Sequence, residues 1–176
     1  AVAVATGRVV GFMDLYKAQW LKVFRKKLGL ASALEGDEAL VQDLLDMMQM
    51  SRADFTTTFR GLCGAIETGA AGALRGEFFD LQRFDQWLAR WQARLALEGQ
   101  PPSAAAAVMR RANPAYIARN HRVEHALQQV VKHGDLTPFD ELFAVLQRPY
   151  DDQPGFERYA EPPGEDFGPY RTFCGT

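Results

Sequence analysis

Apolar residues recur every three or four positions through most of the chain, which is the period of an amphipathic α-helix. No stretch alternates apolar and polar residues as a half-buried β-strand does. The fold class predicted is therefore all-α, with residues 1–148 forming one helical bundle. The pattern predicts seven helices, over residues 10–28, 38–50, 55–67, 80–98, 104–111, 114–133 and 138–147.

Residues at the ends of two expected helices support these boundaries. Asn113-Pro114 and Thr137-Pro138 each place a capping side chain before a proline, which suits the first helical turn because its missing N–H costs nothing there. Gly134 is expected to end the first of these helices, since glycine adopts a positive φ easily. The two helices that flank this glycine are expected to form an αα-hairpin.

Segments outside these two helices carry weaker signals. Asp37 and Asp54 are expected to cap the helices that follow them. Residues 67–78 are rich in glycine and alanine and are expected to form a flexible connection. Residues 149–176 contain several prolines and no periodic apolar pattern. They are predicted to form an irregular, proline-rich tail that lies over the helices.

The composition narrows the classes of partner. A net charge of −2 gives no electrostatic case for nucleic acid, and no apolar run is long enough to span a bilayer. Neither nucleic acid nor a membrane is therefore expected as a partner. Two cysteines are too few for a disulfide framework or for a zinc site by themselves. Cys63 lies in an apolar helical pattern and is expected to be buried, whereas Cys174 lies in the tail and is expected to be exposed.

The segment from His121 to His125 reads HRVEH and fits the H-x-x-E-H pattern, in which two histidines on one helix face bind zinc. A catalytic zinc also needs a third ligand, and no downstream His or Glu lies in a convincing motif. His121 and His125 are therefore weak candidates for metal ligands, and a zinc hydrolase is a minor hypothesis. The periodicity predicts that this helix buries Val123, Leu127, Val130 and Val131 and turns His121, His125, Gln128 and Lys132 to water.

Motifs for other chemistries are missing from the sequence. It contains no G-x-S-x-G elbow, no glycine loop that could cradle phosphate, and no cysteine and histidine at the spacing of a nucleophile pair. The three tryptophans recur at helical positions and are expected to lie in the core. No residue of this chain is therefore predicted to be catalytic or to bind a cofactor.

Five sequence motifs, in order along the chain, resemble the C-terminal region of the selenoprotein O family. Members of this family are kinase-like proteins that transfer AMP from ATP to Ser, Thr or Tyr hydroxyls of proteins. Only one departure is evident: a tryptophan usual after Pro-Pro is replaced here by Gly164-Glu165-Asp166. The motifs are FMDLYKAQWLKVFRKKLGL, DEALVQDLLDMMQMSRADFTTTFRGL, FDQWLARWQARL, MRRANPAYIARNH and RPYDDQPGFERYAEPP.

The resemblance implies that the catalytic lobes lie upstream of the matching region. Those lobes bind ATP and Mg²⁺ or Mn²⁺ in the full-length family protein, and this chain would be inactive by itself. Its role would be to support the upstream kinase-like domain, whose acceptors are protein substrates. Cys174 matches the family's terminal cysteine or selenocysteine, which implies a redox cysteine that pairs with a cysteine near the activation loop. The resemblance also implies a cytoplasmic location, or a mitochondrial one in a eukaryote.

The first residue of the sequence is not methionine, and this favours a fragment of a longer polypeptide. Two interpretations then remain for a chain without an active centre of its own. The first is the C-terminal part of a protein adenylyltransferase. The alternative is an independent helical module that binds another protein.

Overall fold

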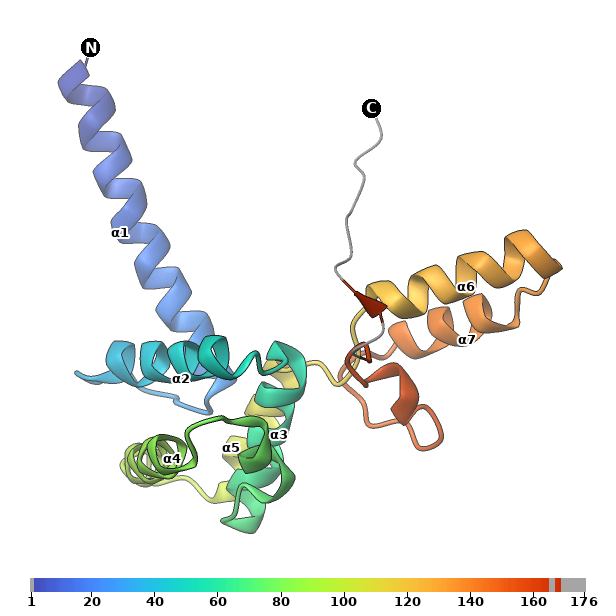
Figure 1. Ribbon diagram of the computed structural model, residues 1–176. Coiled ribbons are helices and arrows are strands. Elements are labelled where there is room, and N and C mark those ends of the chain that lie inside the picture. Colours follow the sequence, from blue (N-terminus) through green and yellow to red (C-terminus); the bar gives the residue numbers. More distant parts are fainter. Residues whose placement is uncertain (1, 165–166, 169–176) are drawn as a thin grey trace. The chain divides into compact units, whose positions relative to one another are not determined.

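The computed structural model describes residues 2–164 and 167–168, with side chains from residue 11 onward (Figure 1). The described residues form helices and no strand, which confirms the all-α prediction. The chain divides into two compact units, residues 1–113 (unit 1) and 114–176 (unit 2). This boundary lies within the stretch 1–148 that the sequence pattern assigned to one bundle.

Unit 1 contains five α-helices and one 3₁₀ helix in the part of the chain that is described. The 3₁₀ helix lies in the stretch expected to be a flexible connection, where Leu74 and Phe78 are buried and anchor the backbone. The elements are α1 (Val2–Lys27), α2 (Asp37–Ser51), α3 (Phe55–Thr68), η1 (Gly72–Glu77), α4 (Leu81–Ala96) and α5 (Pro102–Ala112).

The centre of unit 1 is a stack of aromatic rings on α4. Phe84, Trp87 and Trp91 are fully buried, and the two indole rings lie 5.7 Å apart and nearly parallel. Trp87 Nε1 donates a hydrogen bond of 2.8 Å to the Leu40 carbonyl, and Trp91 Nε1 donates one of 2.9 Å to the Leu28 carbonyl. Each ring therefore buries a large apolar area while its N–H is satisfied, and the predicted core position of these tryptophans is confirmed.

Two aspartates expected to cap helices differ in their roles. Asp54 caps α3, since its carboxylate accepts the Thr57 N–H at 2.8 Å. Asp37 does not cap α2, because Gly36 occupies that position with φ 90°. The buried Asp37 carboxylate instead lies between two guanidinium groups, 2.6 Å from Arg25 Nε and 2.7 Å from Arg94 Nε. Asp37 therefore ties α1 and α4 to the start of α2.

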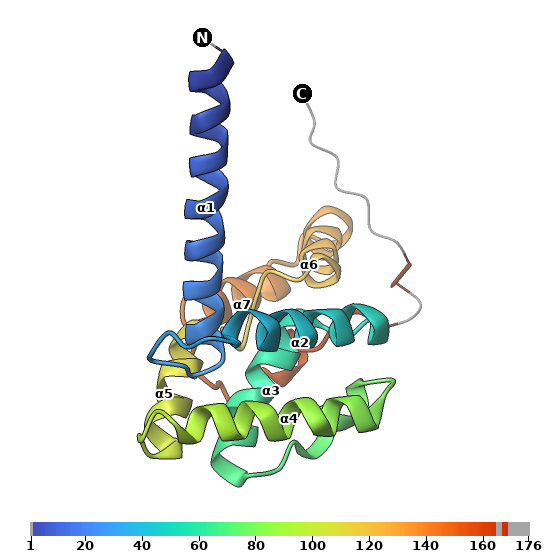
Figure 2. The same cartoon turned by 90° about the vertical axis from the view of Figure 1, so that its left-hand side faces the viewer.

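The two views of unit 1 show that α1 is only partly packed. Its C-terminal end lies against α2 and α5, whereas its N-terminal part extends away from the other elements of unit 1 (Figures 1 and 2). The helix ends where Gly29 takes φ 75°. A side chain at this position would meet Met109 Sδ at 3.0 Å, so glycine is required there for both its φ and its size.

Unit 2 consists of α6 (Asn120–His133), α7 (Thr137–Leu146) and η2 (Glu157–Tyr159), followed by described chain to residue 164 and at 167–168. The two helices lie side by side as the predicted αα-hairpin (Figure 1). Gly134 takes φ 66° at the end of α6, and Asp135 Oδ1 accepts the Thr137 N–H at 2.9 Å at the start of α7. The hairpin turn is therefore built as the sequence indicated.

Candidate functional site

The first residues of unit 2 are extended, so α6 begins six residues later than the expected helix 114–133. Asn113 does not cap a helix that follows it. Its Nδ2 donates a 2.8 Å hydrogen bond to the Lys27 carbonyl, and its Oδ1 accepts one of 3.2 Å from Lys27 Nζ. With this side chain occupied in unit 1, residues 114–119 are free to follow the tail, where the N–H groups of Ala115 and Tyr116 donate to the Pro149 carbonyl.

The periodicity of α6 also misplaces some side chains. Leu127 and Val131 were expected to be buried, but 49% and 83% of their respective surfaces are exposed. Ala126 is the fully buried residue of α6, and Val123 packs beside it on the small core of unit 2. The reason is size: α7 and the tail cover one narrow stripe of α6, and an alanine lets α7 approach closely.

The tail is held on the hairpin by one buried side chain, that of Gln153. Its Nε2 donates hydrogen bonds to the carbonyls of Val145 (3.0 Å) and Arg148 (2.9 Å), two acceptors at the end of α7. Its backbone N–H donates to Tyr116 Oη at 3.2 Å, and Tyr116 Oη donates to its carbonyl at 3.3 Å. Gln153 therefore satisfies the open end of a helix and the returning chain together.

A second group of tail contacts, from Glu157 to Glu161, lies over α6 and α7. The Glu141 carboxylate of α7 accepts hydrogen bonds from Tyr159 Oη at 2.7 Å and from Arg158. These two bonds, Tyr159 first, lower the pKa of the Glu141 carboxyl, while burial raises the pKa of the Tyr159 hydroxyl. Arg122 of α6 donates to the Arg158 carbonyl and pairs with Glu161 at 3.3 Å. We call these residues, together with Gln153 and Tyr116, the tail clamp.

The two candidate metal ligands lie in different hollows of unit 2. His121 borders a cavity of about 370 Å³ with Arg119 and Phe167, whose ring meets the imidazole edge to face at 5.6 Å. His125 is exposed and borders a cavity of about 280 Å³ beside Glu141. His121 is thus partly buried where it was expected to face water, whereas His125 is exposed as expected.

The charges around His121 oppose a cation. Burial lowers the pKa of this imidazole, and the guanidinium groups of Arg122 and Arg119 lower it further. Residues 2–164 and 167–168 contain no group of three His, Cys, Asp or Glu side chains placed to hold a metal ion. The same part of the chain contains no helix that is both long and apolar enough to cross a membrane.

The cysteines are not brought together within the described residues. Cys63 is buried in unit 1, with Sγ 3.7 Å from Asn113 Nδ2, and burial raises the pKa of its thiol. A buried thiol with a raised pKa is a poor nucleophile and a poor partner for disulfide exchange. Cys174, the predicted redox residue, lies outside the described residues.

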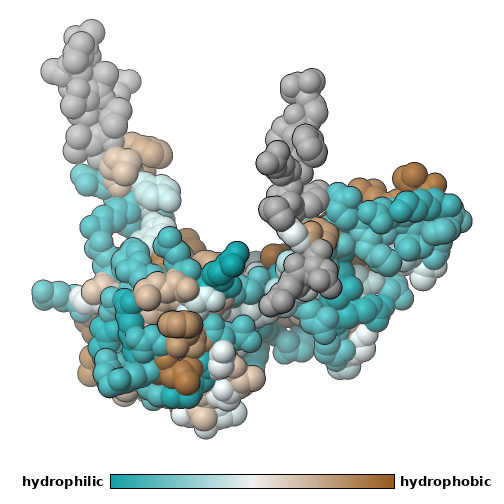
Figure 3. Space-filling model, in the orientation of Figure 1, coloured by the Kyte–Doolittle hydropathy of each residue, from teal (hydrophilic) through white to brown (hydrophobic). Residues whose placement is uncertain are grey.

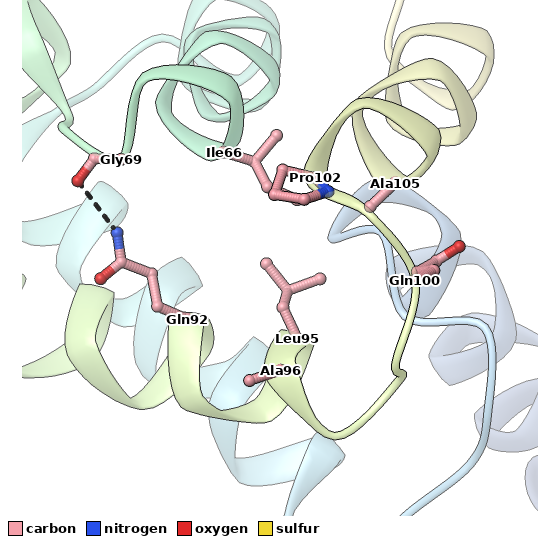
Figure 4. A pocket seen from close by; sticks show the side chains of 8 residues that line it. All are labelled: Ile66, Gly69, Gln92, Leu95, Ala96, Gln100, Pro102 and Ala105. Atoms are coloured by element: carbon pink, nitrogen blue, oxygen red, sulfur yellow. Dashed lines mark hydrogen bonds between the residues drawn. The ribbon is translucent and has the colours of Figure 1, made fainter.

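Sequence reasoning missed a cavity of about 270 Å³ in unit 1, between α3, α4 and α5 (Figure 4). Ile66, Leu95 and Pro102 point toward its interior, and Gln92 Nε2 at its edge donates to the Gly69 carbonyl at 3.3 Å. Its lining includes no acid, base or nucleophile. The cavity can accept a small apolar group but supplies no catalytic one. Its only sequence signal is the presence of small residues at helix ends, which many cavity-free proteins share.

A family model for the protein adenylyltransferase SelO matches residues 4–147, which extend from α1 to the end of α7. The chain belongs to the SelO family. The resemblance predicted from the five motifs is therefore confirmed.

Relatives match over the whole chain. A protein nucleotidyltransferase YdiU of Bradyrhizobium sp. (strain BTAi1) is 47% identical over 176 residues, which are 100% of this chain and 35% of the relative. The corresponding proteins of Methylorubrum populi and Rhizobium etli are 45% and 44% identical, and the chain spans 37% and 35% of their lengths. The chain thus spans about a third of the length of the SelO-family relatives it matches. Residues 148–176, which contain most of the tail clamp, lie outside the family model but inside these alignments.

Proposed function

We propose that this chain is the C-terminal helical part of a protein adenylyltransferase, which transfers AMP from ATP to Ser, Thr or Tyr hydroxyls of proteins. The observation that carries the proposal is the SelO-family match, which covers both units and includes relatives named protein nucleotidyltransferase. The chain supports kinase-like catalytic lobes, and those lobes bind ATP with Mg²⁺ or Mn²⁺. The compartment that fits this role is the cytoplasm.

The side chains of the described units support a structural role. The cavity in unit 1 is lined by apolar and amide groups. The arginines that border the unit 2 cavities include Arg158, which pairs with Glu141, and Arg122, which pairs with Glu161. Triphosphate transfer needs cations free to clamp phosphate and carboxylates free to hold metal. These paired charges instead hold the tail to the helices.

Cys174 takes the redox role in this proposal. The tail clamp fixes the chain as far as Glu161, thirteen positions before Cys174. A terminal segment that starts from a fixed point samples a small volume, which raises the local concentration of its thiol near a neighbouring surface. Its partner would be a cysteine of the catalytic lobes, because Cys63 is buried.

A chimera tests the proposal. The matched third of the Bradyrhizobium relative is replaced by this chain, and the purified protein is incubated with radiolabelled ATP and Mg²⁺ or Mn²⁺ under reducing conditions. We expect the chimera to attach AMP to protein, and we expect the relative without its matched third to lose this activity. Equal AMP transfer with and without the chain would contradict the proposal.

Two valines of unit 2 provide a matched pair of variants for the same assay. Val145 is 1% exposed in the core of the hairpin, whereas 83% of Val131 is exposed on α6. Val145→Asp buries an unpaired carboxylate and should remove AMP transfer together with the fold of unit 2. Val131→Asp adds the same charge in water and should leave AMP transfer unchanged.

A further inference from the structure

Aromatic residues follow one line along α1 at intervals of four residues: Phe12, Tyr16, Trp20 and Phe24. Side chains four apart on a helix are neighbours, so this spacing produces one continuous aromatic row. The rings of Phe12 and Tyr16 lie 6.4 Å apart, and those of Trp20 and Phe24 lie 4.6 Å apart. The row is thus a structural feature of α1 from one end of its described side chains to the core.

Only the C-terminal half of this aromatic row is covered by the described part of the chain. Phe24 is buried and contacts the Phe59 ring of α3, and Trp20 packs partly against the same core. Phe12 and Tyr16 are 62% and 57% exposed, and no other described element of unit 1 lies beside this part of α1 (Figures 1 and 2). Figure 3 shows hydrophobic atoms along the same part of the helix. The covered half of the row therefore continues directly into an uncovered half.

A partner is needed to explain both the helix and the row. A helical segment without tertiary contacts is marginal in water, and Gly7 and Gly11 weaken this segment further because glycine is a poor helix former. Large apolar patches at a protein surface mark interaction sites. Burial of the row would supply the free energy that the sequence of this segment lacks.

We propose that the exposed half of the aromatic row, Phe12 and Tyr16 with Leu15, docks in an apolar groove on the nucleotidyltransferase body that precedes it. This inference rests on the proposed function and names the surface through which the helices join the catalytic lobes. The relatives carry about two thirds of their length outside the matched stretch, which is ample for such a body. The family model begins at residue 4, inside α1, so the helix belongs to the part shared across the family.

Hydrogen exchange of α1 in the isolated chain and in the chimera tests this docking. In the isolated chain, amides of residues 5–19 should exchange rapidly, since nothing packs on them. In the chimera they should exchange at least about tenfold more slowly. Equal exchange in the two proteins would overturn the proposal. So would protection in the isolated chain that rises with its concentration, because the partner would then be a second copy.

Matched double variants identify the surface. Phe12→Ala with Tyr16→Ala should remove the protection of α1 in the chimera, whereas Val131→Ala with Leu136→Ala removes exposed apolar groups of unit 2 and should leave it intact. Retained protection in the first double variant would contradict the assignment. Alanine preserves helix propensity, and the thermal midpoint of unit 1 in the isolated chain should stay unchanged. AMP transfer by the same unmodified chimera reports on the proposed function separately.

Discussion

Replacing Asp37 by asparagine should lower the free energy of unfolding of unit 1 by about 3–5 kcal/mol, since one partner of a buried ion pair is lost. The buried Asp37 carboxylate accepts hydrogen bonds from Arg25, Arg94 and the Leu34 N–H. Asparagine has nearly the same shape but leaves the buried Arg94 guanidinium without its central anion. Urea unfolding followed by tryptophan fluorescence measures unit 1 alone, because all three tryptophans lie there.

Asp43→Asn is the matched control for this experiment. Its partner is Arg90 at 2.7 Å, and both side chains are largely in water. Exposed pairs of this kind contribute about 0–1 kcal/mol, so this variant should unfold almost as the parent does. An Asp37→Asn protein as stable as the Asp43→Asn protein would show that the buried cluster does not hold α1, α2 and α4 together.

The contribution of Asp37 also has a defined pH dependence. Burial by itself raises the pKa of this carboxyl, but the hydrogen bonds from Arg94, Leu34 and Arg25 outweigh it and leave the pKa below its ordinary value. A lowered pKa in the folded state means that the stabilisation is complete above the unfolded pKa of about 4 and is lost as the pH falls through the folded value. The stability difference between parent and Asp37→Asn should therefore shrink below about pH 4.

Replacing Gln153 by alanine should release the tail from the α6–α7 hairpin. Two carbonyls at the end of α7 would lose their donor, at a cost of about 1–3 kcal/mol for each one left buried without a partner. A loss of about 2 kcal/mol raises the population of the open tail about 30-fold, and amides of residues 153–161 should exchange faster by that factor. Hydrogen exchange measured on peptides of the tail provides the test.

Gln147→Ala is the control for the tail, because Gln147 follows α7 directly and its side chain is exposed. Exchange of the tail amides should stay at the parent rate in this variant. If the two variants behave alike, the position of the tail depends on the Arg158, Tyr159 and Glu141 contacts rather than on Gln153. The described path of residues 149–161 would then need a different explanation.

Much of the fold could be predicted from the sequence because it depends on local periodicity. The apolar stripe of α4, with Phe84, Trp87 and Trp91, is the clearest case, since every third or fourth residue enters one core. The hairpin turn at Gly134 is another, because positive φ at a helix end is a local property of glycine. The family could be predicted as well, since its motifs are short runs of neighbouring residues that keep their order along the chain.

The failures share one cause, which is competition for a side chain by a residue far along the sequence. Asp37 has the composition of a helix cap, but Arg94 binds it from 57 positions away. Asn113 could start a helix, but Lys27 occupies its amide from 86 positions away. The tail clamp is invisible for the same reason, since Gln153 acquires its role only when α7 ends beside it. Local pattern therefore predicts the elements, and long-range pairing decides where they begin and which polar groups they bury.

The central claim is that this chain supplies structure to a nucleotidyltransferase and does not itself handle the nucleotide. Titration of ATP with Mg²⁺ or Mn²⁺ into the isolated 176-residue chain, followed by calorimetry, tests it most directly. We predict no saturable binding up to about 1 mM ATP. Saturable binding of one ATP per chain at lower concentrations would contradict the account.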